Sequence, residues 1–321
     1  MNLLVAIVNY KSAQLSIDCL ASLAPQIDDV PDTRVVVVDN ASGDGSVEVL
    51  SAAVREHGWS RWAQVRGLER NGGFAYGNNE AIRPALEGPA AERPRYVLLL
   101  NPDTIARAGA LAKLVEFMDA HPRVGIAGSQ LEYPDGEQHH SRYRFPSILG
   151  EVEGGLRLGF VSRLLAAHMV APPLVSHEHE IDWVAGASMI VRREVFEAIG
   201  YMDADYFLYF EEVDFCLRAR RAGWPCWYVP SSRVAHLVGR SSGLTNLKEP
   251  PRRRPRYWFE SRRRYFVKNH GALYAFAADL AFAVCFGLWR VRRVLQRKPD
   301  PDPPRMWSDF VRFNFLGRYA E

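Results

Sequence analysis

The chain has 321 residues with 48% hydrophobic and 24% charged residues, which is ordinary for a globular protein of one large or two modest domains. Its net charge is only +3, and the positive charge gathers between Arg252 and Lys268, the one stretch that predicts an anionic partner. The four cysteines contain no CxxC pair, which argues against a zinc knuckle or a redox motif. Met1–Val8 predicts a strand rather than a signal peptide, so we expect a cytoplasmic, reducing setting.

Strands and helices alternate through the first part of the chain. Apolar runs predict the strands, and apolar residues at helical spacing, such as Leu15, Cys19 and Leu23, predict the helices between them. In chain order we expect strand 3–8, helix 12–23, strand 34–38, helix 47–57, strand 63–66, a helix ending near 86, strand 96–100, helix 109–120 and strand 125–128. This order predicts an α/β fold with a mostly parallel sheet and helices on both faces.

The later part of the chain is less regular. Residues 130–180 allow no assignment beyond a turn at Pro134-Asp135-Gly136. After them we expect strand 184–191, a short helix over 193–199, a loop and a helix within 206–222, and strand 225–229. The composition changes near Ser241, where a basic segment leads into the almost wholly apolar run Gly271–Trp289. We therefore predict one domain over 1–243 and a helical C-terminal extension over 244–321.

Polar side chains follow three of the predicted strands, namely Asn9-Tyr10, Asp39-Asn40 with Ser42, and Asn101-Pro102-Asp103. Open α/β sheets bind ligands at the carboxyl ends of their strands. Asp39 and Tyr10 offer a nucleotide base an acceptor for its imide N–H and a flat face. Asp103 offers a carboxylate for Mg²⁺ or Mn²⁺, which would also bind pyrophosphate oxygens. The alternatives are that Asp39 caps the following turn and that Asp103 belongs to an Asx turn.

Three further motifs carry candidate chemistry. The glycines within Asn71–Asn79 allow the backbone to approach a ligand, although the segment matches neither GxGxxG nor a Walker loop and alternatively forms a tight turn before a helix. Glu211, Glu212 and Asp214 follow an aromatic run, which would raise the pKa of a carboxylate toward that of a general base. Alternatively, these acidic residues favour a helix N-terminus. His236 follows a strand and is either a metal ligand or a structural residue.

The order of these motifs resembles the family 2 inverting glycosyltransferases of GT-A fold, especially their rhamnosyltransferase-like branch. The resemblance covers residues 3–243 and rests on Val8-Asn9-Tyr10, Val38-Asp39-Asn40-Ala41-Ser42, Asn71-Gly72-Gly73-Phe74-Ala75 with Asn78-Asn79, Asn101-Pro102-Asp103, Gly186-Ala187 with Arg192-Arg193, and Glu211-Glu212-Val213-Asp214. It implies a Rossmann-like GT-A domain, a nucleotide-diphosphate sugar as donor, and Mg²⁺ or Mn²⁺ as cofactor.

The resemblance also implies a role for each matching residue. Asp39 binds the nucleotide base, and Asp103 matches the last Asp of the DXD motif, with Asn101 in place of the first. Glu212 matches the catalytic base, which is usually Asp, and Glu211 beside it is the alternative. The full expected set is Asn9, Tyr10, Asp39, Ser42, Asn71, Gly73, Asn78 and Asn101 for the donor, Asp103 and His236 for the metal, and Trp183, Gly186, Ala187 and Asp214 on the acceptor side.

The processive motif Gln-x-x-Arg-Trp of the family is missing, so the resemblance implies transfer of a single sugar. It further implies dTDP-rhamnose or a UDP-sugar as donor and a glycan or lipid-linked acceptor in cell-envelope polysaccharide synthesis. One alternative is a nucleotidyltransferase acting on sugar phosphates, which would carry a Gly-rich, basic loop where this chain has Asn9-Tyr10-Lys11-Ser12. The other is a non-catalytic nucleotide-sugar-binding protein, in which degraded carboxylates would be expected.

The apolar run Gly271–Trp289 is just long enough to span a bilayer, but Asp279 at its centre would cost about 2.5–3.5 kcal/mol there. We expect instead a helix in the interface of the inner face of the plasma membrane, with the Arg252–Lys268 cluster on anionic head groups. The alternatives are a helix packed against the catalytic domain or in a homodimer interface. The basic run carries no recognisable nucleic-acid motif, so we expect no nucleic-acid partner.

Overall fold

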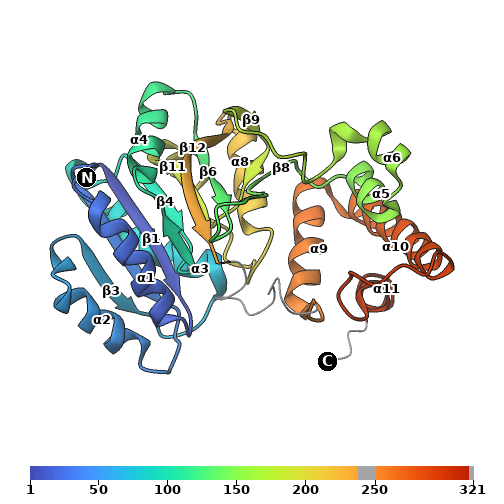
Figure 1. Ribbon diagram of the computed structural model, residues 1–321, viewed down its shortest axis with the longest axis horizontal. Helices are drawn as coiled ribbons and strands as arrows, with labels where there is room; N and C mark the ends of the chain where they lie inside the picture. Colours follow the sequence, from blue (N-terminus) through green and yellow to red (C-terminus); the bar gives the residue numbers. More distant parts are fainter. Residues whose placement is uncertain (238–250, 318–321) are drawn as a thin grey trace.

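The computed structural model describes residues 1–237 and 251–317 (Figure 1). The predicted domain boundary at 243/244 and the segment Ser241-Ser242-Gly243 lie outside the described residues. The main sheet has the strand order β3-β2-β1-β4-β11-β6-β12-β5. These strands are β1 (Leu3–Asn9), β2 (Thr33–Asp39), β3 (Ala63–Gly67), β4 (Tyr96–Leu100), β5 (Thr104–Ala106), β6 (Ile126–Glu132), β11 (Ser188–Arg192) and β12 (Cys226–His236). Two short strands extend it, β7 (Gln138–His139) beside β6 and β9 (His179–Ile181) beside β12, while β8 (Arg142–Tyr143) and β10 (Trp183–Val184) form a separate pair.

The strand directions bring several strand ends to one edge of the sheet. β1 runs parallel to β2 and β4, and β2 runs parallel to β3. β11 runs antiparallel between β4 and β6, and β12 runs parallel to β6. The predicted α/β fold with a mostly parallel sheet is confirmed. The carboxyl ends of β1, β2 and β4 therefore meet the amino end of β11, which is the edge where such sheets bind ligands.

Helices cover both faces of the sheet, as the alternation of side chains along β1 requires. Leu3, Val5 and Ile7 pack in one layer with α1 (Ala13–Leu23), α2 (Ser46–Glu56) and α4 (Ala110–Ala120). Leu4 and Ala6 pack in the opposite layer with α3 (Gly73–Glu87), α7 (Arg193–Ile199) and α8 (Glu211–Arg221). Successive side chains of a strand point to opposite faces, so a continuous apolar run marks a strand buried on both.

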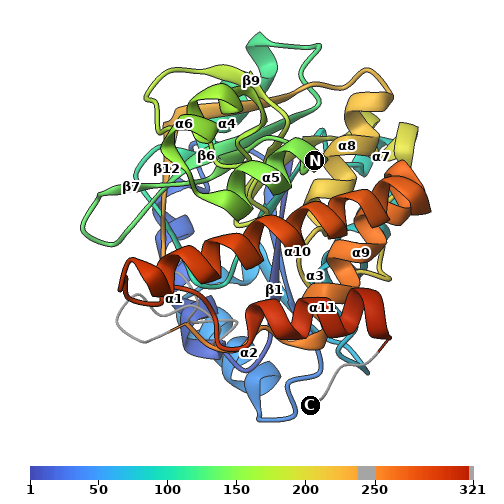
Figure 2. The same ribbon diagram turned by 90° about the vertical axis from the view of Figure 1, so that its right-hand side faces the viewer.

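The predicted helical C-terminal extension is confirmed, and part of the unassigned segment 130–180 joins it. The extension consists of α9 (Arg256–His270), α10 (Ala272–Leu295) and α11 (Met306–Leu316). Figure 2 shows α10 running across this end of the molecule between α5 (Ile148–Leu156) and α11, and α6 (Gly159–Leu164) follows α5. Segments more than 100 residues apart in the sequence therefore form one helical layer.

Some of the basic residues in Arg252–Lys268, which we expected to contact head groups, pair with carboxylates of neighbouring helices. Arg262 pairs with Asp279, the carboxylate at the centre of α10, and lies 3.1 Å from Glu151 on α5. Arg253 lies 2.7 Å from Asp309 on α11. These carboxylates are buried or nearly so, and pairing offsets the desolvation that an isolated buried charge would suffer. Arg253 and Arg262 thus join the helices of the extension to one another and, through Glu151, to α5.

Candidate active site

The carboxylate of Asp39 is held in place at the end of β2. Asn9 Nδ2 and Ser42 Oγ donate to Asp39 Oδ1 at 2.7 and 2.5 Å, and the Ser42 amide donates to Oδ2 at 2.9 Å. Asn9 Oδ1 in turn accepts hydrogen bonds from the hydroxyls of Ser12 and Ser16 at 3.0 and 2.9 Å. The buried Asn9 side chain, which we expected to bind the donor, therefore holds the Asp39 carboxylate in position.

A pocket of about 540 Å³ opens beside Asp39, within the size range of small-ligand sites. It is lined by Asp39, Ala41, Gly43, Gly45, Ser46, Val47, Glu48, Gly67 and Leu68. The loop between β2 and α2 and the end of β3 form most of this lining, and the sequence patterns did not indicate these residues as ligand contacts. Tyr10 lies outside the lining and is 39% exposed, with Lys11 Nζ 5.5 Å from its ring centroid.

The loop at the start of α3 contacts the segment that leads into α8, the helix that begins with Glu211 and Glu212. Gly73 has φ +86°, and a Cβ at this position would lie 1.9 Å from the carbonyl oxygen of Phe207. The amide of Phe74 donates to that same oxygen at 2.9 Å. Asn71 Oδ1 accepts from the Asn40 side chain at 2.9 Å and from the Gly73 amide at 3.0 Å. Only glycine permits this close approach, which explains why the loop needs it at position 73.

Asp103 and His236 meet where β5 pairs with the end of β12. His236 Nε2 lies 3.4 Å from Asp103 Oδ1, and the Leu237 amide donates to the Asp103 carbonyl at 2.9 Å. Within the described ranges, Asn101 Oδ1 and His236 Nδ1 are buried without a hydrogen-bond partner. His139 on β7, which the sequence did not indicate, places its ring centroid 5.7 Å from that of His236. Burial, and then the neighbouring His236, lower the pKa of His139 to about 4.

Glu211 and Glu212 begin α8 but lie in different surroundings. Glu211 is 2% exposed, whereas Glu212 is partly exposed. Burial raises the pKa of Glu212 to about 7, and burial followed by the charge of Glu212 raises the pKa of Glu211 well above its ordinary value. In the described part of the chain, the Oε2 atom of each residue has no hydrogen-bond partner. Near neutral pH, Glu212 is therefore the carboxylate that combines ionisation with access to a substrate.

Gly186 and Ala187 occupy the break between β10 and β11 and lie against this helix. A Cβ on Gly186 would lie 3.1 Å from the ring of Phe74 and 3.9 Å from the Cβ of Glu212. The carbonyl of Ala187 accepts from the amide of Asn101 at 3.1 Å. The strand break thus connects the end of β4 with the start of α8. The loop at the start of α3, the Asn101–Asp103 turn and Glu212 consequently lie along the same edge of the main sheet.

An aromatic pair borders Glu212 on the side expected to receive the acceptor. Trp183 stacks on Tyr143 with ring centroids 4.3 Å apart, and Trp183 Nε1 donates to the Arg144 carbonyl at 3.0 Å. Burial, and then the charge of Glu212, raise the pKa of Tyr143 to about 12. Tyr143 was not predicted, because it lies on a two-residue strand in the unassigned segment.

Two predicted site residues, Asn78 and Asp214, are buried and hydrogen-bonded to other parts of the protein. Asn78 is 1% exposed, and its amide donates to the Phe74 carbonyl at 3.0 Å one turn earlier in α3. Asp214, expected on the acceptor side, is fully buried and bound to Arg218, Lys268 and Asn269. It lies two positions after Glu212 in the helix, so its side chain points toward a different neighbour, α9.

Comparison with known proteins identifies the fold and the family. The model described as "Glycosyltransferase like family 2" matches residues 2–266. The chain belongs to this family. An N-acetylglucosaminyl-diphospho-decaprenol L-rhamnosyltransferase of Mycobacterium tuberculosis is 31% identical over 216 residues, 65% of this chain and 68% of that protein. A dTDP-rhamnosyl transferase of Shigella flexneri is 24% identical over 253 residues, 78% of this chain and 76% of that protein.

Solved structures agree with the family match. A mannosyltransferase from Pyrobaculum calidifontis in complex with GDP-Man and Mn²⁺ superimposes with a TM-score of 0.56 at 18% identity, over 92% of this chain and 75% of that one. This likeness concerns the fold alone, and it confirms the predicted GT-A architecture. The protein is thus a glycosyltransferase of family 2 with rhamnosyltransferases among its relatives, as the sequence motifs predicted.

Proposed function

We propose that this glycosyltransferase moves one sugar from a nucleotide-diphosphate sugar to an acceptor hydroxyl with inversion, using Glu212 as the base. The acceptor oxygen attacks the anomeric carbon and forms the new C–O bond, while the bond to the diphosphate breaks and its electron pair leaves with the phosphate oxygen. Glu212 takes the hydroxyl proton. The observation that carries this proposal is a partly exposed Glu212 whose pKa is raised to about 7, beside Gly186 and Tyr143.

Asp39 and Asp103 have separate roles in donor binding under this proposal. The pocket beside Asp39 would take the nucleotide base, with the Asp39 carboxylate held toward it by Asn9 and Ser42. Asp103 would lie at the diphosphate, two strand pairings away from Asp39, since β1 lies between β2 and β4. The alternatives, a nucleotidyltransferase and a non-catalytic binding protein, are disfavoured by the family match and by the presence of all three carboxylates.

The residues around Asp103 suit a hard divalent cation. Asp103 supplies a buried carboxylate, His236 an imidazole with its Nε2 at 3.4 Å from that carboxylate, and Asn101 a buried carbonyl oxygen. Mg²⁺ and similar ions are commonly bound by one or two protein side chains together with phosphate oxygens of the substrate. When bound, such an ion neutralises charge on the leaving diphosphate. The mannosyltransferase neighbour contains Mn²⁺, which supports either Mn²⁺ or Mg²⁺ here.

The relatives suggest the donor and the acceptor. One carries dTDP-rhamnosyl transfer in its name, and another names a diphospho-decaprenol-linked sugar with L-rhamnosyl transfer. We therefore propose dTDP-rhamnose as the first donor to test, with UDP-sugars second, and a lipid-linked glycan as acceptor in cell-envelope polysaccharide synthesis. Such an acceptor would place the enzyme in the cytoplasm, at the inner face of the plasma membrane.

One face of α10 supports this placement. Among the described residues, α10 is the one helix long and apolar enough to cross a bilayer, which by itself is weak evidence. The exposed positions of α10 are all apolar, and they recur every three or four residues: Ala272, Leu273, Phe276, Leu280, Val284, Leu288, Val291, Val294 and Leu295. Asp279, the acidic residue of α10, is buried. We propose that this apolar stripe of α10 lies in an anionic membrane surface.

Release of nucleoside diphosphate tests the proposed function. The purified protein is incubated with dTDP-rhamnose, UDP-glucose or UDP-N-acetylglucosamine and a polyprenyl-diphosphate-linked sugar, and released diphosphate is measured with and without acceptor. Acceptor-dependent release, with a product whose anomeric configuration is inverted by NMR, supports the proposal. Binding without release would favour the non-catalytic alternative. In a parallel incubation with a nucleoside triphosphate and a sugar 1-phosphate, formation of a nucleotide sugar with release of inorganic diphosphate would favour a nucleotidyltransferase.

A further inference from the structure

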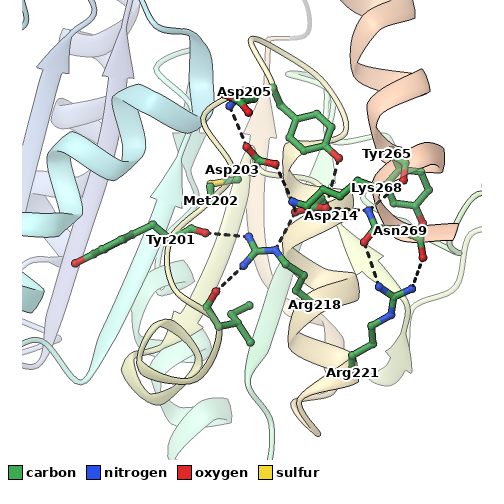
Figure 3. Close-up of polar contacts among 12 residues, drawn as sticks. Tyr201, Met202, Asp203, Asp205, Asp214, Arg218, Arg221, Tyr265, Lys268 and Asn269 are labelled. Atoms are coloured by element: carbon green, nitrogen blue, oxygen red, sulfur yellow. Dashed lines mark hydrogen bonds and ion pairs between the residues drawn. The ribbon is translucent and has the colours of Figure 1, made fainter. Parts of the chain in front are cut away.

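The C-terminal helix α9 contacts the helix that carries Glu212 through a buried carboxylate. Lys268 Nζ donates to Asp203 Oδ2 at 2.7 Å and to Asp214 Oδ2 at 2.9 Å, and Asn269 Nδ2 donates to Asp214 Oδ1 at 2.8 Å (Figure 3). Arg218, one turn further along α8, donates from Nε to Asp214 Oδ2 at 2.9 Å. The Asp214 carboxylate therefore receives donors from two helices that are far apart in the sequence.

The contact between Asp214 and Lys268 is an ion pair near neutral pH, because the pKa of Asp214 lies below its ordinary value. Burial alone would raise the pKa of Asp214, but the hydrogen bonds from Lys268, Asn269 and Arg218 outweigh burial and hold that pKa below its ordinary value. A buried charge becomes costly when one of its partners is removed. The relative position of α8 and α9 is consequently fixed by the Asp214 carboxylate.

α9 also contacts the turn immediately before the catalytic carboxylates. Ser261 Oγ donates to the Leu208 carbonyl at 3.0 Å, and the ring centroids of Phe210 and Tyr265 lie 5.7 Å apart. Tyr209 and Phe210 have φ values of +71° and +67°, a left-handed conformation that costs a residue other than glycine roughly 1–3 kcal/mol. Such a turn persists only where its surroundings fix it, and α9 supplies these contacts.

Glu212 depends on this support because the hydrogen bonds that its carboxylate accepts come from backbone amides of its own first turn, those of Glu212 and Val213. Its Oε2 atom is buried without a hydrogen-bond partner among residues 1–237 and 251–317. The direction of the carboxylate is therefore set by the position and rotation of the first turn of α8. Contacts from α9 fix that turn at both ends, through Leu208 before it and Asp214 within it.

We infer that α9 is a positioning element of the catalytic centre, in which Lys268 and Asn269 hold Glu212 in place through Asp214. This inference rests on the proposed role of Glu212 as the base. Groups proposed to bind the donor, such as Asp39 and Asp103, lie on or just after the central strands rather than on α8 or α9. Loss of the α9 contact should therefore disturb proton transfer more than donor binding, which separates positioning from general stability.

The test compares substitutions of Lys268 in the full chain. Lys268→Met should lower kcat roughly 10- to 100-fold, the scale expected for a small displacement of a catalytic group. The KM for the donor should stay within about twofold, because the donor contacts are unchanged. Lys268→Arg keeps the charge and should restore most of the rate. Arg256→Met is the matched control, since it removes another cation of α9 whose partner, Glu260 at 2.8 Å, lies on the exposed side of the same helix.

Melting temperatures of all variants identify losses due to unfolding, and Asn269→Ala replaces Lys268→Met if the latter does not fold. A wild-type kcat in the folded Lys268→Met or Asn269→Ala enzyme overturns the inference. So does an equal loss in Arg256→Met, or a loss that Lys268→Arg fails to restore. Absence of sugar transfer by the wild type overturns the proposed function and this inference with it, whereas an active wild type with unaffected variants overturns the inference alone.

Discussion

At the scale of single residues, Glu212 carries the strongest prediction. Replacing it with Gln removes the proton acceptor but keeps the size, so turnover should fall by about two to four orders of magnitude while donor binding is nearly unchanged. In the wild type, kcat should rise with pH through about 7, the pKa to which burial raises Glu212. Steady-state kinetics across pH 5–9 check both points. A Glu212→Gln variant with near wild-type turnover would show that Glu212 is not the base.

The raised pKa of Glu212 also makes the stability of the protein depend on pH. A carboxyl whose pKa is raised from 4.5 to about 7 on folding binds its proton more tightly in the native state, so its contribution to stability is full below 4.5 and is lost as pH rises through 7. Glu212→Gln should therefore melt at a higher temperature than wild type at pH 8 and at a similar temperature below pH 4.5. A lower melting temperature of the variant at pH 8 would contradict a desolvated Glu212.

Asp103 gives a separate prediction about the metal. Asp103→Ala, or chelation by excess EDTA, should abolish transfer, and Mn²⁺ or Mg²⁺ should restore the chelated wild type but not the variant. Binding of Mn²⁺ followed by electron paramagnetic resonance supplies a readout that does not depend on turnover. Full activity in excess EDTA would show that the ion is not needed. The buried position of Asp103 beside His236 is the reason for this expectation.

At the scale of elements, the loop that begins α3 depends on Gly73. A Cβ there would meet the Phe207 carbonyl oxygen at 1.9 Å, so Gly73→Ala must displace the segment that leads into α8. We expect a loss of stability of about 1–3 kcal/mol and a fall in kcat. Gly109→Ala is the matched control, because Gly109 also has a positive φ, +75°, but an added Cβ there meets nothing closer than 4.0 Å. Chemical denaturation should show a larger loss for Gly73→Ala; equal losses would mean that the close approach to Phe207 is unimportant.

The sequence predicted the elements whose pattern is local and long. The runs Leu3–Val8 and Tyr96–Leu100 are buried on both faces, and such continuous apolar runs predict strands without any knowledge of the tertiary fold. Asp39 and Asp103 could be predicted as site residues because each stands at or just after the end of such a strand. The run 184–191 instead breaks into β10 and β11, because β10 pairs with β8 while β11 enters the main sheet. His139 and Tyr143 lie on strands of two residues, which are too short to show a period.

The role of Asp214 could not be predicted for a different reason. Its partners Lys268 and Asn269 follow it by 54 and 55 residues, and nothing in the local pattern indicates which face of α8 they will cover. Asn9 likewise looked like a ligand-binding side chain at a strand end, yet Ser12 and Ser16 of the next segment satisfy it. Residue type and strand position predict where a site lies, but long-range packing decides which of its polar residues face the ligand.

At the scale of the whole molecule, charge and exposure are unevenly divided. Residues 251–317 contain fifteen Lys and Arg against five Asp and Glu, a net charge of +10 in a chain whose total is +3. Arg297 and Lys298, which follow α10, and Arg305 and Arg312, which precede and belong to α11, remain exposed. Two copies meeting through the apolar stripe of α10 would bring like charges together, whereas anionic head groups would complement them at about 1 kcal/mol for each basic residue near the surface. This argument favours a membrane over a homodimer as the partner of the stripe.

Flotation with liposomes tests the membrane partner. The wild type should float with phosphatidylglycerol-containing vesicles, less so in high salt, and should stay behind with neutral phosphatidylcholine vesicles. The triple substitution Leu280→Ser, Leu288→Ser and Val291→Ser removes exposed apolar side chains without touching the buried face, so it should abolish flotation while leaving the melting temperature and turnover on a soluble acceptor unchanged. A truncation before α9 is a poorer test, because it would also expose Asp214 and the turn at Leu208. If the wild type ignores anionic vesicles but sediments as a dimer that the triple substitution converts to monomer, the stripe is a subunit interface and the membrane placement is wrong.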